Sequence, residues 1–300
     1  MDSNAPAIPV YFSTGLRGRG HRGLVERIMF GTFKAAAGIN ALALLVICGF
    51  LLYYGLPAIS WEFLSEVPRS SMTEGGIWPC IVGTFLLAFG SMLVAFPLGV
   101  ASAIYLNEYA TNPKVGRIIR LGINNLAGVP SVVFGLFGLA FFVTFLKMGV
   151  SILAGVLTLG ALTLPVIIGT AEEALRSVPN TYREASLGLG ATKWQTISKV
   201  VLPAAMPGML TGAILGLSRA AGETAAIMFT AAVFYTPKMP DSIFSNVMAL
   251  PYHVYVLATA GTQIEKTRPL QYGTSLVLVA LVLGMNLVAI WLRARLQKKL

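Results

Sequence analysis

The sequence predicts an all-α integral membrane protein with six transmembrane helices, and three observations support this prediction. Hydrophobic residues make up 56% of the 300 residues and charged residues only 11%, which is too apolar for an ordinary soluble domain. Several apolar runs reach about 20 residues, the helix length that a bilayer core about 30 Å thick requires. Lys and Arg gather in alternate loops, as the positive-inside rule requires. Six helices with both termini in the cytoplasm agree with all three.

Residues 1–34 are polar and basic, and we expect them to form a cytoplasmic tail. A signal peptide is the alternative, but the basic region is long and the apolar run after it exceeds the usual core of such a peptide. We expect the transmembrane helices at about residues 35–56, 81–106, 126–145, 152–171, 207–234 and 271–292. Pro97 predicts a kink in the second helix. The loop at 107–125 should be cytoplasmic, and the loop at 235–270 external.

Composition also excludes several classes of function. The net charge of +10 could suggest a nucleic-acid partner, but its distribution over alternate loops favours a membrane protein. Cys48 and Cys80 fall in or near different predicted spans, so we expect no disulfide, and the two His residues have no metal-ligand spacing. The chain contains no Gly-x4-Gly-Lys-Ser/Thr sequence, so it is not an ATPase. His253, alone among Tyr and Pro in the last external loop, is read as a packing residue rather than a pH sensor.

Residues 177–207 form a charged, amphipathic stretch between two very apolar segments. Thr181 with Glu184, and Thr192 with Gln195, have the spacing of capping boxes, which begin helices. The stretch therefore predicts two short helices outside the membrane, joined by a tight turn. Such a shape suits a docking element; a plain pair of interfacial helices is the alternative.

Glycine and proline set the expected limits of these two helices. Gly188 and Gly190 suit the left-handed residue that closes the first helix. Pro203 is expected to stop the second helix, and Pro207 to occupy the first turn of the next transmembrane helix.

Arg219 and Glu223 are charged residues within the predicted fifth span. Measured along a helix from Pro207 at 1.5 Å per residue, they lie at about 18 and 24 Å, which is membrane depth. Each charge there costs on the order of 3 kcal/mol on insertion scales, so the pair is expected to have a role. Small residues repeat every four positions on the same helix, which lets a neighbouring helix approach closely; they are Gly208, Gly212, Gly216, Ala220 and Thr224. Two interpretations stay open: a buried ion pair that locks two helices, and a gate or anion contact on a transport path, because an Arg guanidinium matches tetrahedral oxyanions.

The spacing within residues 177–207 resembles the EAA loop of bacterial ABC-importer permeases. The matching residues, in motif order, are Glu184, Ala185, Ser186, Gly190, Val200, Leu202 and Pro203. Ser186 and Val200 are conservative departures from the pattern. The resemblance implies that residues 177–203 form a coupling loop, which fits a groove on a separate ATP-hydrolysing subunit.

A second resemblance concerns the substrate. Residues 217–226 look like the corresponding signature of phosphate-specific permeases, and residues 97–110, 125–131 and 249–255 agree with it. The last of these is more similar to the A-type (PstA) subunit than to its C-type companion. By this resemblance, which covers roughly residues 83–292, the candidates for the translocation path are Ser218, Arg219, Glu223 and Thr224.

The resemblance implies a type I ABC importer permease fold and a permease subunit of an ATP-driven phosphate importer in a bacterial or archaeal plasma membrane. The implied partners are a dimer of ATPase subunits that binds ATP and Mg, a second permease subunit of the C type and an extracytoplasmic phosphate-binding protein. This chain itself is expected to bind no cofactor. A permease for another oxyanion, such as sulfate or molybdate, is the nearest alternative. An ion-coupled secondary transporter and a membrane-embedded enzyme are more distant ones, since we see neither an inverted repeat nor a catalytic cluster.

Overall fold

The computed structural model describes residues 19–69, 72, 74–236, 238–260 and 264–297. The chain divides into two compact units, residues 1–50 and 51–300, and each is described by itself. The first unit contains most of helix α1 (Arg19–Gly55). From Val25 to Phe50 the side chains of this helix are exposed, and they are mainly apolar, as expected for a span surrounded by lipid. Helix α1 therefore includes most of the first predicted transmembrane segment, residues 35–56, and begins further toward the N-terminus.

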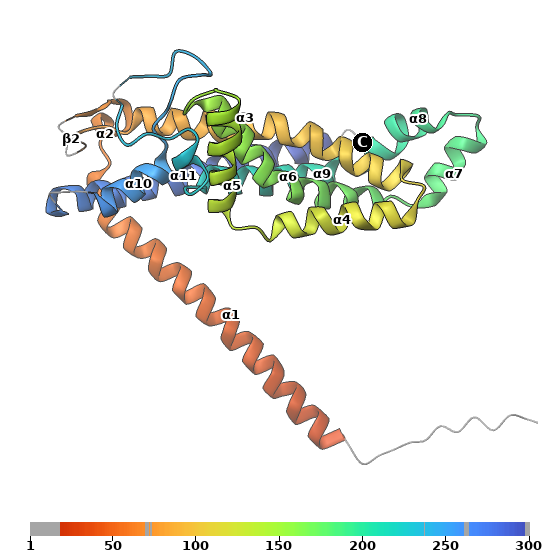
Figure 1. Ribbon diagram of the computed structural model, residues 1–300. Coiled ribbons are helices and arrows are strands. Elements are labelled where there is room, and N and C mark those ends of the chain that lie inside the picture. Colours follow the sequence, from red (N-terminus) through yellow and green to blue (C-terminus); the bar gives the residue numbers. More distant parts are fainter. Residues whose placement is uncertain (1–18, 70–71, 73, 237, 261–263, 298–300) are drawn as a thin grey trace, which may run out of the picture. The chain divides into compact units, whose positions relative to one another are not determined.

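The second unit is a helical bundle (Figure 1). Its long apolar helices are α3 (Trp78–Ile104), α6 (Ile152–Arg176), α9 (Leu202–Gly222) and α11 (Ile264–Gln297). With α1, the described residues contain five helices long and apolar enough to span a membrane, and a bent pair makes a sixth if the pair is one span. The predicted six-span, all-α class is therefore confirmed.

Short elements lie at the two ends of this bundle. Helix α7 (Asn180–Gly188) and α8 (Lys193–Thr196) lie at one end, and α2 (Trp61–Ser65) and α10 (Leu250–Thr259) lie at the opposite end (Figure 1). The α10 end also carries the 3-10 helix η1 (Leu56–Ala58) and a two-stranded antiparallel sheet of β1 (Pro68–Arg69) and β2 (Glu74–Gly75).

The predicted third span, residues 126–145, is wrong as a straight helix. Helix α4 (Pro113–Ala127) and the segment Ser131–Phe145, which comprises α5 (Ser131–Gly138) and the π-helix η4 (Leu139–Phe145), meet at an angle of 98°. Pro130 explains the break, because it lacks a backbone N–H and disfavours a helical residue before it. The loop expected at 107–125 is largely helix α4, which begins where the Asn112 side chain accepts a hydrogen bond from Lys114 N at 3.0 Å.

The predicted fifth span, residues 207–234, is displaced toward the N-terminus. The structure shows one continuous helical segment from Lys193 to Gly222, made of α8, the π-helix η5 (Ile197–Val201) and α9. After Gly222 the backbone leaves the helix, and Glu223 is extended, with φ −75° and ψ 129°. The chain then folds irregularly, with one 3-10 turn, η6 (Ile227–Phe229), until α10 begins at Leu250.

The irregular segment 223–249 caps the first turn of α6. A helix leaves its first backbone N–H groups without partners inside the helix. Here the N–H groups of Ser151, Ile152 and Leu153 donate to the carbonyl oxygens of Thr230, Ser245 and Ile243 at 3.0, 2.9 and 2.9 Å. The first part of the segment is buried as well, because Ala226, Ile227 and Ala231 belong to one apolar cluster with residues of α3, α5 and α6. Irregular backbone at membrane depth is tolerated only where its polar groups are satisfied in this way.

Glycines allow the close contacts of this core. A Cβ on Gly212 of α9 would collide with the side chain of Thr170 of α6, and one on Gly208 would approach Ala174 to 2.7 Å. The predicted close approach along the small-residue face of α9 is thus present. On α3, a Cβ on Gly83 would collide with the backbone carbonyl oxygen of Met248.

We predict that Gly83→Ala lowers the stability of the bundle by about 1–3 kcal/mol, because a backbone carbonyl cannot move aside as a side chain can. Thermal unfolding of the purified full-length protein in detergent measures the effect. Gly284→Ala is the matched control: Gly284 also lies within a long helix, and a Cβ there meets nothing within 4 Å. The control should be neutral or stabilising by about 0.5–1 kcal/mol. Equal midpoints for the two variants would contradict the packing described here.

Candidate functional site

The α7–α8 end of the bundle presents an exposed surface with large apolar side chains. Helix α7 has no buried residue. Leu189, in the turn after it, is 90% exposed, and Trp194 of α8 is 60% exposed. Glu184 and Ala185 of the EAA pattern are exposed on α7. We call this region, residues 180–196, the docking surface. Apolar groups so exposed outside the apolar spans are typical of a surface that binds another protein.

The turn between the two helices has the predicted geometry at Gly190. Its φ of +85° is a left-handed conformation. Gly190 N donates to Leu187 O at 2.9 Å and Ala191 N to Ser186 O at 3.2 Å, which is the bonding pattern of a Schellman motif. Nothing lies within 4 Å of a Cβ built on Gly190, so its backbone conformation, and not crowding, demands glycine. Gly188, the other candidate, is the last helical residue of α7.

One of the two predicted capping boxes is present. Thr192 Oγ1 accepts from Gln195 N at 3.3 Å, and Gln195 Oε1 accepts from Thr192 N at 2.8 Å. The prediction of Thr181 as a cap is wrong, because α7 begins one residue earlier, at Asn180, and Pro179 precedes it with an extended ψ of 141°.

The predicted stop at Pro203 is also wrong. Leu202 and Pro203 lie half-buried in the first turn of α9, which continues directly from η5 and also includes Pro207. In η5 the hydrogen bonds span five residues; for example, Leu202 N donates to Ile197 O. A π turn of this kind changes the register just before Pro203, so the missing N–H of the proline does not break the helix.

Arg183 anchors the docking surface to the bundle. Its guanidinium donates to Glu108 Oε1 from Nη2 at 2.8 Å and from Nε at 3.2 Å. It also donates to the carbonyl oxygens of Leu175 and Val178 at 2.9 and 2.8 Å. Glu108 belongs to the π-helix η3 (Tyr105–Tyr109), which continues α3. One side chain therefore joins α7, the end of α6 and the end of α3.

A second ionic cluster holds α4 to α6. Glu172 Oε1 accepts from Arg120 Nε and from Arg176 Nη2, both at 2.6 Å, and Arg120 Nη2 donates to Leu106 O at 3.0 Å. Neither cluster was predicted from the sequence. Arg120 and Glu172 are 52 positions apart and Arg183 and Glu108 are 75 apart, so local spacing carries no signal for these pairs; only Glu172 and Arg176 are four apart.

Arg219 lies in the last turn of α9 with an exposed side chain. It forms no hydrogen bond or ion pair with any residue that the structure describes. An ion pair with Glu223 is thus not formed, because Glu223 lies past the end of the helix and its Oε1 accepts from Ala225 N at 3.1 Å. Arg219 adds a favourable charge near the carbonyl end of α9.

Ser218 and Thr224 flank this arginine and glutamate along the chain. Ser218 Oγ donates to Asn286 Oδ1 at 2.7 Å, which links α9 to α11. Asn286 was not singled out from the sequence, although a polar residue within an apolar span is the signal that could have found it. Thr224 is partly exposed. The structure thus gathers all four predicted path residues around the end of α9, 30 helical residues from the start of α8.

His253 is buried in α10, and its Nδ1 has no hydrogen-bond partner in the described part of the chain. Burial lowers the pKa of His253 from 6.5 to about 4. The imidazole is therefore neutral near pH 7, which favours the interpretation as a packing residue.

Comparison with known proteins identifies the family. Residues 95–300 match the binding-protein-dependent transport system inner membrane components. The chain belongs to this family of ABC importer permeases. This permease is 36% identical over 292 residues to the probable ABC transporter permease protein YqgI of Bacillus subtilis, covering 93% of the chain and 99% of that protein. It is also 36% identical over 219 residues to the phosphate transport system permease protein PstA 1 of Mycobacterium tuberculosis, covering 73% of the chain and 71% of that protein.

Solved structures show the same fold. A chain of a bacterial ABC transporter that imports the polysaccharide alginate matches 91% of the permease, with a TM-score of 0.60 and 14% identity, over 98% of that chain. A chain of the MetNI methionine ABC transporter, in an inward-facing conformation, matches 74% of the permease with a TM-score of 0.58 and 21% identity, over 94% of that chain. The permease therefore has the type I ABC importer permease fold.

We predict that Arg183→Gln destabilises the docking surface by about 3–5 kcal/mol, because it leaves the buried carboxylate of Glu108, 9% exposed, without its cation. The rate of protease cleavage within residues 177–203 should rise accordingly. Arg117→Gln is the matched control, since Arg117 is exposed on α4 and makes no ion pair with a described residue. The double variant Glu108→Gln/Arg183→Gln should recover part of the loss. Cleavage of Arg183→Gln no faster than that of Arg117→Gln would exclude the anchor.

Proposed function

We propose that the permease is the A-type subunit of an ATP-driven phosphate importer. The observation that carries the proposal is the guanidinium of Arg219, which is exposed and without a partner among the described residues at the end of a membrane helix. An unpaired charge at membrane depth is retained where it faces protein or a water-filled cavity with a function. The similarity to PstA 1 of M. tuberculosis supports phosphate as the substrate.

The irregular chain after Gly222 suits the passage of an anion. A straight helix would keep its backbone groups in its own hydrogen bonds, whereas after Gly222 the chain leaves the helix close to Arg219. Thr224 supplies a hydroxyl there, and Glu223 is held by Ala225 N at 3.1 Å instead of neutralising the arginine. The planar fork of the Arg219 guanidinium can donate two hydrogen bonds to one tetrahedral oxyanion.

The continuity of α8, η5 and α9 supports coupling of this helix to ATP hydrolysis by a partner subunit. The docking surface would bind a groove of an ATPase subunit, of which the complex needs two, and those subunits bind ATP and Mg. Because the helical segment is unbroken from Lys193 to Gly222, a displacement at α8 moves the segment that carries Arg219. The Arg183–Glu108 contact would transmit the same displacement to α3 and α6. ATP then biases two states of the bundle that differ in access to the path.

The remaining partners complete the path. A second permease subunit, of the C type, would enclose it from the side on which Arg219 is exposed. A phosphate-binding protein would deliver the substrate at the α10 end, and the docking surface and both termini would face the cytoplasm. A solved relative of the same fold is described in complex with a substrate-bound periplasmic protein, which supports a partner of this kind.

The proposal is tested by ATP-driven uptake of labelled phosphate into proteoliposomes that hold the whole complex, with sulfate and molybdate as competitors. Phosphate alone should compete. Competition by sulfate or molybdate would reject phosphate as the specific substrate in favour of another oxyanion. It would not contradict the role of the docking surface in binding an ATPase subunit. Uptake without ATP would reject both and favour an ion-coupled transporter.

We predict that Gly190→Ala lowers uptake per ATP hydrolysed by on the order of tenfold, because a left-handed alanine costs about 1–2 kcal/mol and displaces Leu189 and Trp194. The ratio of uptake to phosphate release in proteoliposomes measures it. Gly188→Ala, in a helical position with open space around its Cβ, should keep the wild-type ratio. A wild-type ratio of uptake to ATP hydrolysis in Gly190→Ala would show that the left-handed turn is not needed for coupling.

We predict that Arg219→Gln abolishes phosphate uptake while the complex assembles normally. Arg219→Lys, which keeps the charge but loses the planar fork, should retain a small part of the activity. Assembly is checked by size-exclusion chromatography and uptake by the same assay. Wild-type uptake by Arg219→Gln would place the guanidinium outside the path.

A further inference from the structure

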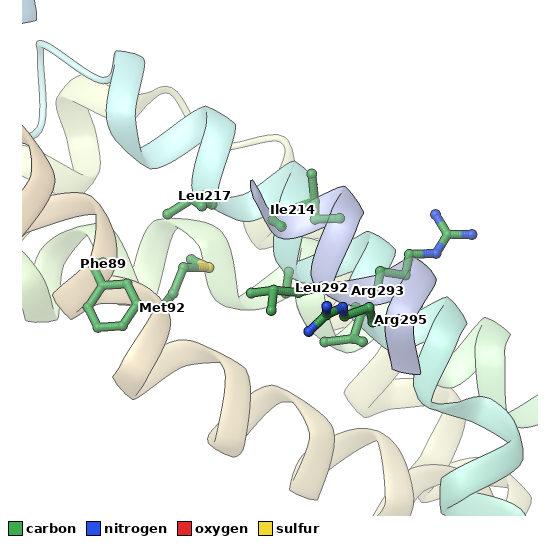
Figure 2. A pocket seen from close by; sticks show the side chains of 10 residues that line it. Phe89, Met92, Ile214, Leu217, Leu292, Arg293 and Arg295 are labelled. Carbon is green, nitrogen blue, oxygen red and sulfur yellow. The ribbon is translucent and has the colours of Figure 1, made fainter. Parts of the chain in front are cut away.

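An apolar groove runs along the surface of the bundle between α3, α9 and α11. Its volume is about 620 Å³. Phe89 and Met92 of α3 and Leu217 of α9 lie toward one end, and Leu292, Arg293 and Arg295 of α11 lie at the other (Figure 2). Leu210, near the α8 end of α9, lines the groove together with the two arginines, so these lie toward the same end of the bundle as the docking surface.

The groove is lined by apolar side chains over most of its length, which suits a hydrocarbon chain. Ala213, Ile214 and Leu217 form the α9 wall, and Ala289 and Leu292 form the α11 wall. Phe89 and Leu292 are each 49% exposed, so the groove opens toward the surroundings of the bundle. In a protein that spans a membrane, an exposed apolar groove is open to lipid chains unless another protein segment covers it.

The arginine end differs from the rest of the groove in charge. Arg293 Nε is buried and has no hydrogen-bond partner among the residues that the structure describes. Neither Arg293 nor Arg295 forms an ion pair with a described carboxylate. Two guanidinium groups without an ion pair among the described residues leave this end of the groove positively charged, so an anion from outside the chain would stabilise it.

Arg295 and Trp291 mark the level of the membrane surface. The Arg295 guanidinium lies over the Trp291 ring, 4.3 Å from its centroid. Trp is enriched where the apolar core of a bilayer meets the head groups, and Arg near a helix end reaches the same level. These residue types place the apolar part of the groove at the level expected for acyl chains, and its charged end at the level expected for phosphates.

We infer that this groove is a binding site for one anionic phospholipid, with an acyl chain along α3, α9 and α11 and the anionic head group at the end that carries Arg293 and Arg295. Two features favour this occupant. The groove is apolar along most of its length and positively charged at one end, as a phospholipid is apolar in its chains and charged in its head group. The guanidinium fork pairs with phosphate oxygens. Basic pockets between transmembrane helices on the cytoplasmic side are typical sites for anionic head groups. The site is separate from Arg219, and the inference does not depend on which solute is transported.

Native mass spectrometry of the whole complex in detergent tests the inference, with phosphatidylglycerol and phosphatidylcholine of identical acyl chains offered in equal amounts. The wild-type complex should retain phosphatidylglycerol at least tenfold more than phosphatidylcholine. Arg293→Gln/Arg295→Gln should abolish this preference, and Arg293→Lys should retain part of it. Arg117→Gln, with its charge on α4 away from the groove, should keep the preference.

A second pair of variants tests the apolar part. Ala289→Trp fills the groove and should reduce retention of both lipids, whereas Ala280→Trp, on an exposed position of α11 outside the groove, should not. Equal retention of the two lipids by the wild-type complex would overturn the inference. So would a preference that survives both Arg293→Gln/Arg295→Gln and Ala289→Trp, since it would reflect lipid bound elsewhere. Retention of neither lipid would overturn it too, because the groove would then be filled by protein.

Discussion

The constraint on which the rest of the structure depends is that a chain in the membrane must satisfy its backbone polar groups within the protein. The segment after Gly222 meets it by capping the first N–H groups of α6 with its own carbonyls. This arrangement permits the helix to end after Gly222. The break in turn separates Arg219 from Glu223 and leaves the guanidinium without a partner in the described part of the chain. A local backbone rule thereby creates the candidate site.

The same rule shapes the route from the docking surface to that site. Pro203 could have ended the helix, because it lacks a backbone N–H. The π turn of Ile197–Val201 changes the hydrogen-bond register just before it, and the helix continues to Gly222. One rigid element therefore carries the docking surface at its start and Arg219 near its end. The Arg183–Glu108 contact ties the same surface to α3 and α6. The unbroken helical segment from Lys193 to Gly222 and the end of the helix after Gly222 both suit an ATP-driven permease.

Features set by local chemistry were predictable from the sequence. Gly190 needed a left-handed backbone, Thr192 and Gln195 formed their capping box, and most of the apolar runs formed helices long enough to span a membrane. Features set by distant partners were not. The irregular segment depends on its contacts with α6. The helix continues through Pro203 because of a π turn that no residue pattern predicts. The ion pair of Arg183 depends on a carboxylate 75 positions away. The structure places Ser218, Arg219, Glu223 and Thr224 around the end of α9, but the interpretation of Arg219 and Glu223 as an ion pair assumed an unbroken helix.

The most direct test of this account is the thiol reactivity of a Thr224→Cys variant, in a full complex whose Cys48 and Cys80 are replaced by serine. If the break after Gly222 opens onto a wet path that binds the substrate beside Arg219, a charged thiol reagent should modify the introduced cysteine. Phosphate should slow this modification, and sulfate should not. A Thr224→Cys variant that does not react, or that reacts at the same rate with and without phosphate, would contradict a phosphate path at the end of α9.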